Sequence, residues 1–248
     1  MLIMILIHDS GYRCLKHFYQ KEVCKHMRHF FPKVVFYNRF VELDKEVAIP
    51  LALFLKKVLP GKCMGISFVD STQLLVCRNQ RIHIHKTFKG IAQRGKCSMG
   101  WFFGFKLNLI CNEKGELLNF MITPGDVDNR KYLEYKAFIE LIYGKLGYIS
   151  KNLFQRLFVD GIQLITKLKS NMKGALMSVS DKLLLRKRAI IETVNDELKN
   201  IAQVEHSRHR CFDNFIVNLL GGIADYCFFP PKPCINVRRT IDTQIALF

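Results

Sequence analysis

Three strand-like segments follow one another in the middle of the chain, and they limit its fold more than any other feature. Residues 66–77, 100–111 and 115–123 are rich in β-branched and aromatic side chains. Asn-Glu-Lys-Gly at 112–115 separates the last two, a composition typical of a tight turn between antiparallel strands. Helical and strand patterns alternate after them. The sequence therefore predicts a mixed α/β domain, a sheet flanked by helices.

The first 60 residues predict helices. Apolar side chains recur every three or four residues from Leu15 to Phe30, with cations on the other face. Pro32 ends this helix, and Asn38 is placed to cap a second helix that Pro50 kinks or breaks. The basic face at 14–29 fits either a solvated surface of a packed domain or a DNA contact.

Further elements are predicted after the third strand. Residues 132–142 predict a helix and 157–169 a strand. The clearest helix runs over 181–203, with Ile191, Val194, Leu198 and Ile201 forming its apolar stripe, and residues 213–229 predict another helix.

The net charge of the chain indicates what kind of partner it binds. The chain has 38 Lys and Arg against 21 Asp and Glu over 248 residues, a formal charge of +17. Such an excess favours a polyanionic partner, DNA or RNA. Nine cysteines without a C-x-x-C pair argue against a disulfide framework and a zinc site, and favour free thiols in the cytoplasm. The opening MLIMILI is too short for a membrane span or a secretory signal, so we expect no membrane partner.

No acidic residue lies between Asp70 and Glu113, and this stretch is basic. A run of one sign repels itself unless a polyanion neutralises it, so DNA contact is favoured over an ordinary solvated insert. The candidate DNA-binding cations here are Arg78, Arg81, Lys86, Lys89, Arg94 and Lys96.

Two acids are candidates for catalysis. Asp70 follows an apolar strand segment, where a carboxylate needs a cation, hydrogen bonds or a metal, although a structural Asp in a turn is the alternative. Glu192 lies on the predicted helix, four residues after Arg188 and seven before Lys199. These three residues fit either a surface ion-pair row or a metal-binding carboxylate whose flanking cations meet phosphates.

The spacing of Arg188, Glu192 and Lys199 resembles the C-terminal signature of bacterial insertion-sequence DDE transposases, with Leu185 where a Tyr is usual. Other segments extend the likeness. FVDST (68–72), HKTFKGIAQRGK (85–96), GWFFGFKLNLI (100–110), TPGDVDNR (123–130), LITKLKSNMK (164–173), RAIIETVNDELKN (188–200) and EHSRHR (205–210) resemble the insertion sequence 982 family in order and spacing.

The resemblance implies a ribonuclease H-like fold in which three carboxylates hold two Mg²⁺ or Mn²⁺ ions. Asp70 would be the first carboxylate and Glu192 the third, both catalytic and metal-binding. Two metals stabilise the attacking and leaving oxygens of a phosphodiester. The implied partners are the element's terminal inverted repeats and target DNA, bound by a homodimer in the bacterial cytoplasm, associated with the nucleoid.

This chain departs from the family pattern at the second carboxylate. Relatives have an Asp just before Gly-Tyr-Ile-Ser, but Gly147 is preceded here by Tyr-Gly-Lys-Leu, so no second catalytic Asp is identified. Asp126, Asp128 and Asp160 are poor replacements, since metal sites tolerate only small ligand displacements. Relatives also carry more residues ahead of the segment matching Met1. Both features predict a decayed copy.

The predicted organisation is a helical segment at 1–60 (a truncated DNA-binding region), a ribonuclease H-like domain at 61–234 and a tail at 235–248. Two alternatives stay open. The first is a non-catalytic DNA-binding protein derived from a transposase, and the second is a basic RNA-binding or ribosome-associated protein. Asp70 and Glu192 speak against the second, because plain RNA binding does not need them.

Overall fold

The computed structural model describes most of the chain and groups it into two compact units. The described residues are 1–58, 60–62, 65–97, 100–129, 141–144, 155, 159, 163–166, 177–205, 209–235 and 245–246. A helical unit comprises residues 1–60, 83–90 and 195–230, and a sheet unit comprises 61–82, 91–194 and 231–248. Each unit is described by itself below, and the domain boundaries given above stay a prediction.

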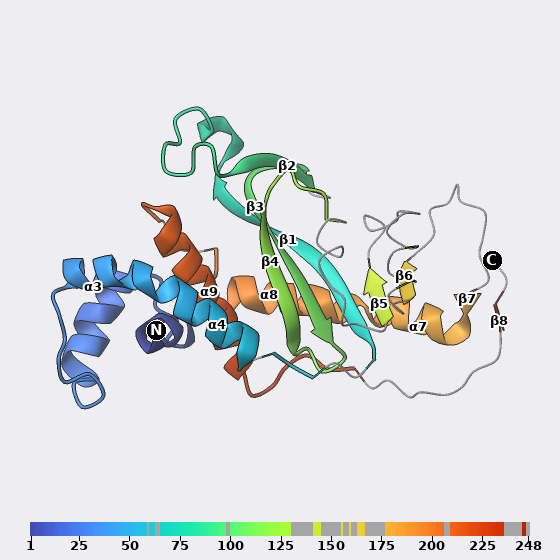
Figure 1. Cartoon of the computed structure of the whole chain (residues 1–248), viewed down its shortest axis with the longest axis horizontal. Helices are drawn as coiled ribbons and strands as arrows, with labels where there is room; N and C mark the ends of the chain where they lie inside the picture. The colour runs from blue at the N-terminus through green and yellow to red at the C-terminus, as the bar shows by residue number, and fades with distance from the viewer. Residues whose placement is uncertain are drawn as a thin grey trace. The chain divides into compact units, whose positions relative to one another are not determined.

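The helical unit is built around one long helix. This helix, α9, packs against α1 and α4 (Figure 1). The elements of the unit are α1 (Leu2–Asp9), α2 (Leu15–Phe18), the π-helical segment η1 (Tyr19–His26), α3 (Tyr37–Asp44), the 3₁₀ turn η2 (Lys45–Val47), α4 (Ala48–Lys57) and α9 (Phe212–Phe228). The predictions of helices in the first 60 residues and at 213–229 are confirmed.

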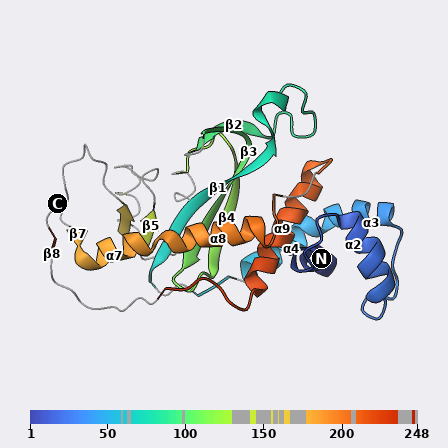
Figure 2. The same cartoon turned by 180° about the vertical axis from the view of Figure 1, so that it is seen from behind.

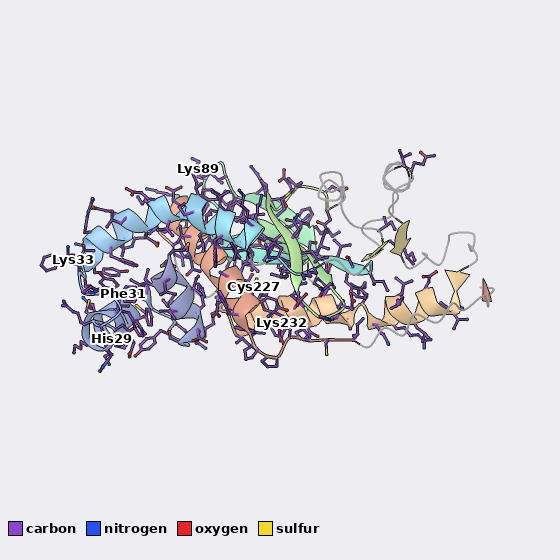
Figure 3. The ribbon with its side chains drawn as sticks, turned by 60° about the horizontal axis from the view of Figure 1, so that its bottom comes forward. His29, Phe31, Lys33, Lys89, Cys227 and Lys232 are labelled. Carbon is purple, nitrogen blue, oxygen red and sulfur yellow. The ribbon has the colours of Figure 1, made fainter. Side chains whose placement is uncertain are left out.

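The basic amphipathic helix is present but is wound differently from the prediction. Over η1 the hydrogen bonds span five residues at its end, where the Met27 N–H donates to the Glu22 carbonyl at 2.9 Å. Phe18 and Val23, five residues apart, are therefore both fully buried. Phe30 was expected in the same stripe, but it is 69% exposed. Figure 3 shows the neighbouring His29, Phe31 and Lys33 at the end of this unit.

The start of α3 corrects one prediction. Phe36, not Asn38, precedes the first helical residue, so Asn38 lies inside the helix and does not cap it. The predicted break falls at η2, and Pro50 follows in the first turn of α4. Proline is tolerated there because the first N–H groups of a helix have no intrahelical partner.

The sheet unit contains a mixed sheet. Its strand order is β2-β3-β1-β5-β6, with β4 also paired to β3. Pairs among β1 to β4 are antiparallel, whereas β5 is parallel to both β1 and β6. The strands are β1 (Ser67–Cys77), β2 (Gln93–Cys97), β3 (Gly100–Asn112), β4 (Leu117–Pro124), β5 (Leu141–Gly144) and β6 (Gln163–Thr166).

The three predicted central strands and their turn are confirmed. The turn between β3 and β4 is closed by a 3.1 Å hydrogen bond from the Gly115 N–H to the Asn112 carbonyl. Gly115 has a φ of +70° and lies against the Pro233 carbonyl, a conformation and a space that suit glycine. The acid-free basic stretch contains β2, which was not predicted and which pairs with Gly100–Gly104 of β3.

Two helices lie along one face of the sheet. The first part of α8 (Ala189–Asn200) is behind the strands in Figure 1 and in front of them in Figure 2, and α7 (Val179–Lys187) packs beside β5 and β6. The prediction of one continuous helix over 181–203 is wrong, because the chain leaves helical geometry at Arg188. Ile191 and Val194 are fully buried, as expected.

Other predictions fall partly outside the described residues. Leu141 and Ile142 belong to β5, so the predicted helix over 132–142 is wrong at its end, and its remainder is not described. Ile201, expected in the apolar stripe of α8, is 54% exposed. Met177–Ser178 (β7) and Ile245–Ala246 (β8) pair as a small second sheet. Within the described part of the chain, no helix has the length and apolar character needed to cross a membrane.

A buried acid in α9 makes the stability of the helical unit depend on pH. Asp225 is 3% exposed, and its Oδ2 has no hydrogen-bond partner among the described residues. Burial, and secondarily the charge of Asp9, raises the pKa of Asp225 to about 7. Its pKa in the unfolded chain is about 3.9. The unfolded state therefore loses this proton first, and the free energy of unfolding falls as the pH rises from about 4 to about 7.

We predict that Asp225→Asn stabilises the protein at pH 8 by about 1–3 kcal/mol, because the amide removes the cost of burying a charge. The gain should shrink towards pH 4, and urea unfolding at both pH values measures it. Asp213→Asn, an exposed acid on the same helix, is the control and should show no such gain. An equal gain for Asp225→Asn at both pH values would contradict the prediction.

Candidate active site

Asp70 is a buried acid in the interior of the sheet. It lies within β1, between β3 and β5, and pairs with Leu109 of β3. Asp70 is only 2% exposed, and its Oδ1 accepts a 2.8 Å hydrogen bond from the Ser71 N–H. Because β1 continues to Cys77, Asp70 is a strand residue, and the alternative of a turn residue is wrong.

Side chains alternate along a strand, so Asp70 shares its face with Phe68 and Leu74, which are 0% and 1% exposed. An ionised carboxylate on this apolar face must be compensated, since desolvation of an unpaired charge costs several kcal/mol.

Arg188 brings the two predicted carboxylates together. Arg188 is the residue between α7 and α8, and its side chain is 13% exposed. One guanidinium nitrogen, Nη2, donates to Glu192 Oε1 at 2.8 Å, and the other, Nη1, is 3.9 Å from Asp70 Oδ2. Asp70 and Glu192 therefore lie on two sides of one guanidinium, on the face of the sheet along which α8 runs.

The two ion pairs differ in exposure. The Asp70 side chain is 3% exposed, whereas that of Glu192 is 48% exposed. The Glu192 pair alone resembles an ordinary helix-surface pair of a few tenths of a kcal/mol. The buried Asp70 charge makes the arrangement unusual. It also acts on the neighbouring Cys111, whose pKa is raised first by burial and then by the charges of Asp70 and Glu113, so this thiol stays protonated.

The donor set suits a hard divalent cation but is incomplete in the described residues. Carboxylate oxygens are the preferred ligands of Mg²⁺ and Mn²⁺. Among the residues that the structure describes, no three His, Cys, Asp or Glu side chains are grouped to hold a metal ion. β5 (Leu141–Gly144) contains no acid. Asp160 lies outside the described residues, and so does the position just before Gly147. Asp126 and Asp128 line a groove beside β2.

The predicted DNA-binding cations fall into two groups. Lys199 pairs with Glu205 at 3.2 Å, and Arg188 lies between the carboxylates. The other six are exposed: Arg78, Arg81, Lys86, Lys89, Arg94 and Lys96. Sequence reasoning placed Arg188 towards phosphates and missed its contact with Asp70. The four-residue spacing of Arg188 and Glu192 predicts their ion pair. The contact between Arg188 and Asp70 arises only when the residues around Arg188 pack on β1.

Comparison with known families agrees with this architecture. A family model described as "Transposase DDE domain" matches residues 60–212, more than half of the chain. No curated protein matches the chain. The mixed sheet with an acid on its central strand defines the ribonuclease H-like class, as predicted. The chain belongs to the DDE transposase domain family, whose members use divalent metals to cleave and transfer DNA strands.

We predict that Arg188→Met destabilises the sheet unit by about 1–3 kcal/mol at pH 7, because Asp70 loses the cation beside it. Adding Asp70→Asn should recover most of the loss, because the buried charge is then gone. Urea unfolding of both single variants and the double variant measures this coupling. Losses that simply add in the double variant would show that Arg188 does not compensate Asp70.

Proposed function

We propose that this transposase is that of a bacterial insertion sequence of the 982 family, and that it recognises the terminal inverted repeats of its element. The observation that carries the proposal is the pairing of Asp70 and Glu192 with the single guanidinium of Arg188. The order of the sequence motifs quoted above supports the family assignment. A plain RNA-binding protein has no use for this pair of acids, and the match to the transposase family speaks against it.

In this proposal Asp70 and Glu192 are the carboxylates that hold the metals. The bound Mg²⁺ or Mn²⁺ ions would supply charge stabilisation for the attacking and leaving oxygens of a phosphodiester. Asp70 is fixed by the Ser71 N–H and the strand backbone, whereas the half-exposed Glu192 on α8 can reorient. Arg188 is the cation that contacts both acids.

We also propose that this copy is catalytically weak or inactive. Residues 143–146 are Tyr-Gly-Lys-Leu, so none of the four residues directly before Gly147 is acidic. A site with two of three carboxylates holds metals less tightly, and a displacement of 1 Å can cost about 100-fold in rate. The alternative function, a non-catalytic DNA-binding protein derived from a transposase, rests on this same substitution. DNA binding should survive in either case.

The proposed partners are duplex end-sequence and target DNA, bound by a homodimer that forms on DNA in the cytoplasm, associated with the nucleoid. The exposed cations from Arg78 to Lys96 support this proposal, because each phosphate that a cation neutralises releases counterions. The domain organisation is part of the proposal as well. Residues 61–234 would form the catalytic domain, residues 1–60 would contribute to DNA binding, and residues 235–248 would form a tail.

We predict that affinity for duplex DNA falls steeply with salt. Replacing both Arg78 and Arg81 by Ala should lower the slope of log K against log salt by about 2, since each contributes about one phosphate contact. Lys114→Ala is the matched control, an exposed lysine at the other end of β3. Fluorescence anisotropy at several salt concentrations gives the slopes. A slope of log K against log salt near zero for the unmodified chain would contradict the DNA-binding proposal.

The cleavage test uses end-sequence DNA with Mg²⁺ or Mn²⁺. The unmodified chain should bind but cleave little or nothing, whereas a chain with an Asp-containing segment restored before Gly147 should cleave at least 100-fold faster. Asp70→Ala in the restored chain is the control and should abolish the gain. Efficient cleavage by the unmodified chain that is lost in Asp70→Ala would show that another acid fills the second position.

A further inference from the structure

A groove with an exposed aromatic ring lies beside β2. It measures about 460 Å³, within the ~300–1,000 Å³ range of ligand sites, and is open to solvent. Charged side chains and one ring dominate its lining. They are Arg94, Lys96, Trp101, Lys106, Asp126 and Asp128.

Trp101 is the chain's single tryptophan and is 54% exposed. Lys96 is its direct partner across the β2–β3 ladder, and Arg94, two residues along β2, is on the same face. The Arg94 guanidinium carbon lies 5.0 Å and the Lys96 Nζ 5.8 Å from the centroid of the indole ring. These cation–π contacts hold two positive charges beside an accessible ring.

The wall of the groove is held in place by close packing. Gly95 of β2 lies directly against the Gly125 carbonyl, so no side chain fits between the strand and the turn after β4. The Gly125 N–H donates to the Gly104 carbonyl at 3.0 Å, and Lys106 Nζ donates to the Val127 carbonyl at 2.8 Å. The groove is therefore preformed.

Charge divides the groove into two parts. Burial lowers the pKa of Lys106, and the charges of Asp128 and Asp126 oppose that shift, so these acids are balanced by a lysine of the wall. Arg94 and Lys96 are exposed, and neither makes an ion pair with an acid in the described part of the chain. The cations next to the ring are thus available to an anionic ligand.

We propose that this groove binds an unpaired nucleotide of a DNA strand, with its base stacked on Trp101 and its phosphates beside Arg94 and Lys96. Base–aromatic stacking needs a base whose face is free, which duplex DNA does not offer. A duplex would reach the cations through its phosphates but could not use the ring.

The groove is separate from the acid pair. Asn129, on its rim, donates to Ser71 Oγ at 2.6 Å, and none of Asp70, Arg188 and Glu192 lines the groove. A nucleotide in the groove would therefore be a different one from that held at the acid pair. The inference rests on the proposed function and adds to it that the bound DNA is locally unpaired at this groove.

Because Trp101 is the sole tryptophan, its emission reports the groove directly in the unmodified chain. Titration with a short oligothymidylate should quench the emission in a saturable way, and duplex DNA of the same length should quench it much less. No quenching by the single strand, at concentrations where duplex binding is saturated by anisotropy, would overturn the groove assignment alone. Failure to bind either DNA would overturn the proposed function as well.

Variants test the ring by anisotropy of a labelled oligothymidylate. Trp101→Ala should weaken single-strand binding by about 5- to 150-fold, whereas Trp101→Phe should retain most of it. Duplex affinity should change little in either variant. Phe36→Ala, which removes a 91% exposed ring in the helical unit, is the control and should leave single-strand affinity unchanged. Equal losses for single-strand and duplex DNA in Trp101→Ala would also overturn the proposal.

Discussion

The buried acid Asp70 is the constraint on which this face of the sheet depends. A carboxylate that is 2% exposed within a sheet needs a cation, and Arg188 supplies it from the start of α8. A residue between two helices can direct its side chain to the sheet and, at the same time, pair with Glu192 one turn later. One guanidinium thereby links β1 to the first turn of α8.

The sequence predicted the central meander well because its determinants are local. Alternating apolar residues and the Asn-Glu-Lys-Gly turn define β1, β3 and β4 without reference to the rest of the chain. β2 was missed because Gln-Arg-Gly-Lys-Cys has only polar or small residues, and its strand conformation comes from pairing with β3. β5 was taken for the end of a helix because a short apolar run is equally compatible with either structure.

The candidate site was predictable only in its residue types. Asp70 was singled out by its apolar strand and Glu192 by its helix spacing, and the family motifs supported both. The spacing also predicts the pair of Arg188 and Glu192, but the approach of Asp70 to Arg188 comes from tertiary packing. The helix period runs through Arg188 without a break, so the interruption between α7 and α8 could not be read from the pattern. The groove around Trp101 was equally hidden, since it depends on the turn at Gly125 closing against Gly95.

The way β3 is covered has a consequence for the behaviour of the chain at high concentration. This 13-residue apolar strand has β1 on one side, and β2 and β4 share the other side end to end. Most of its backbone hydrogen-bonding groups are therefore already paired within the sheet. β2 lies at the sheet border among the described strands, and its charged Arg94 and Lys96 oppose edge-to-edge pairing between molecules. The cations proposed to bind a nucleic acid would thus also oppose aggregation of the sheet.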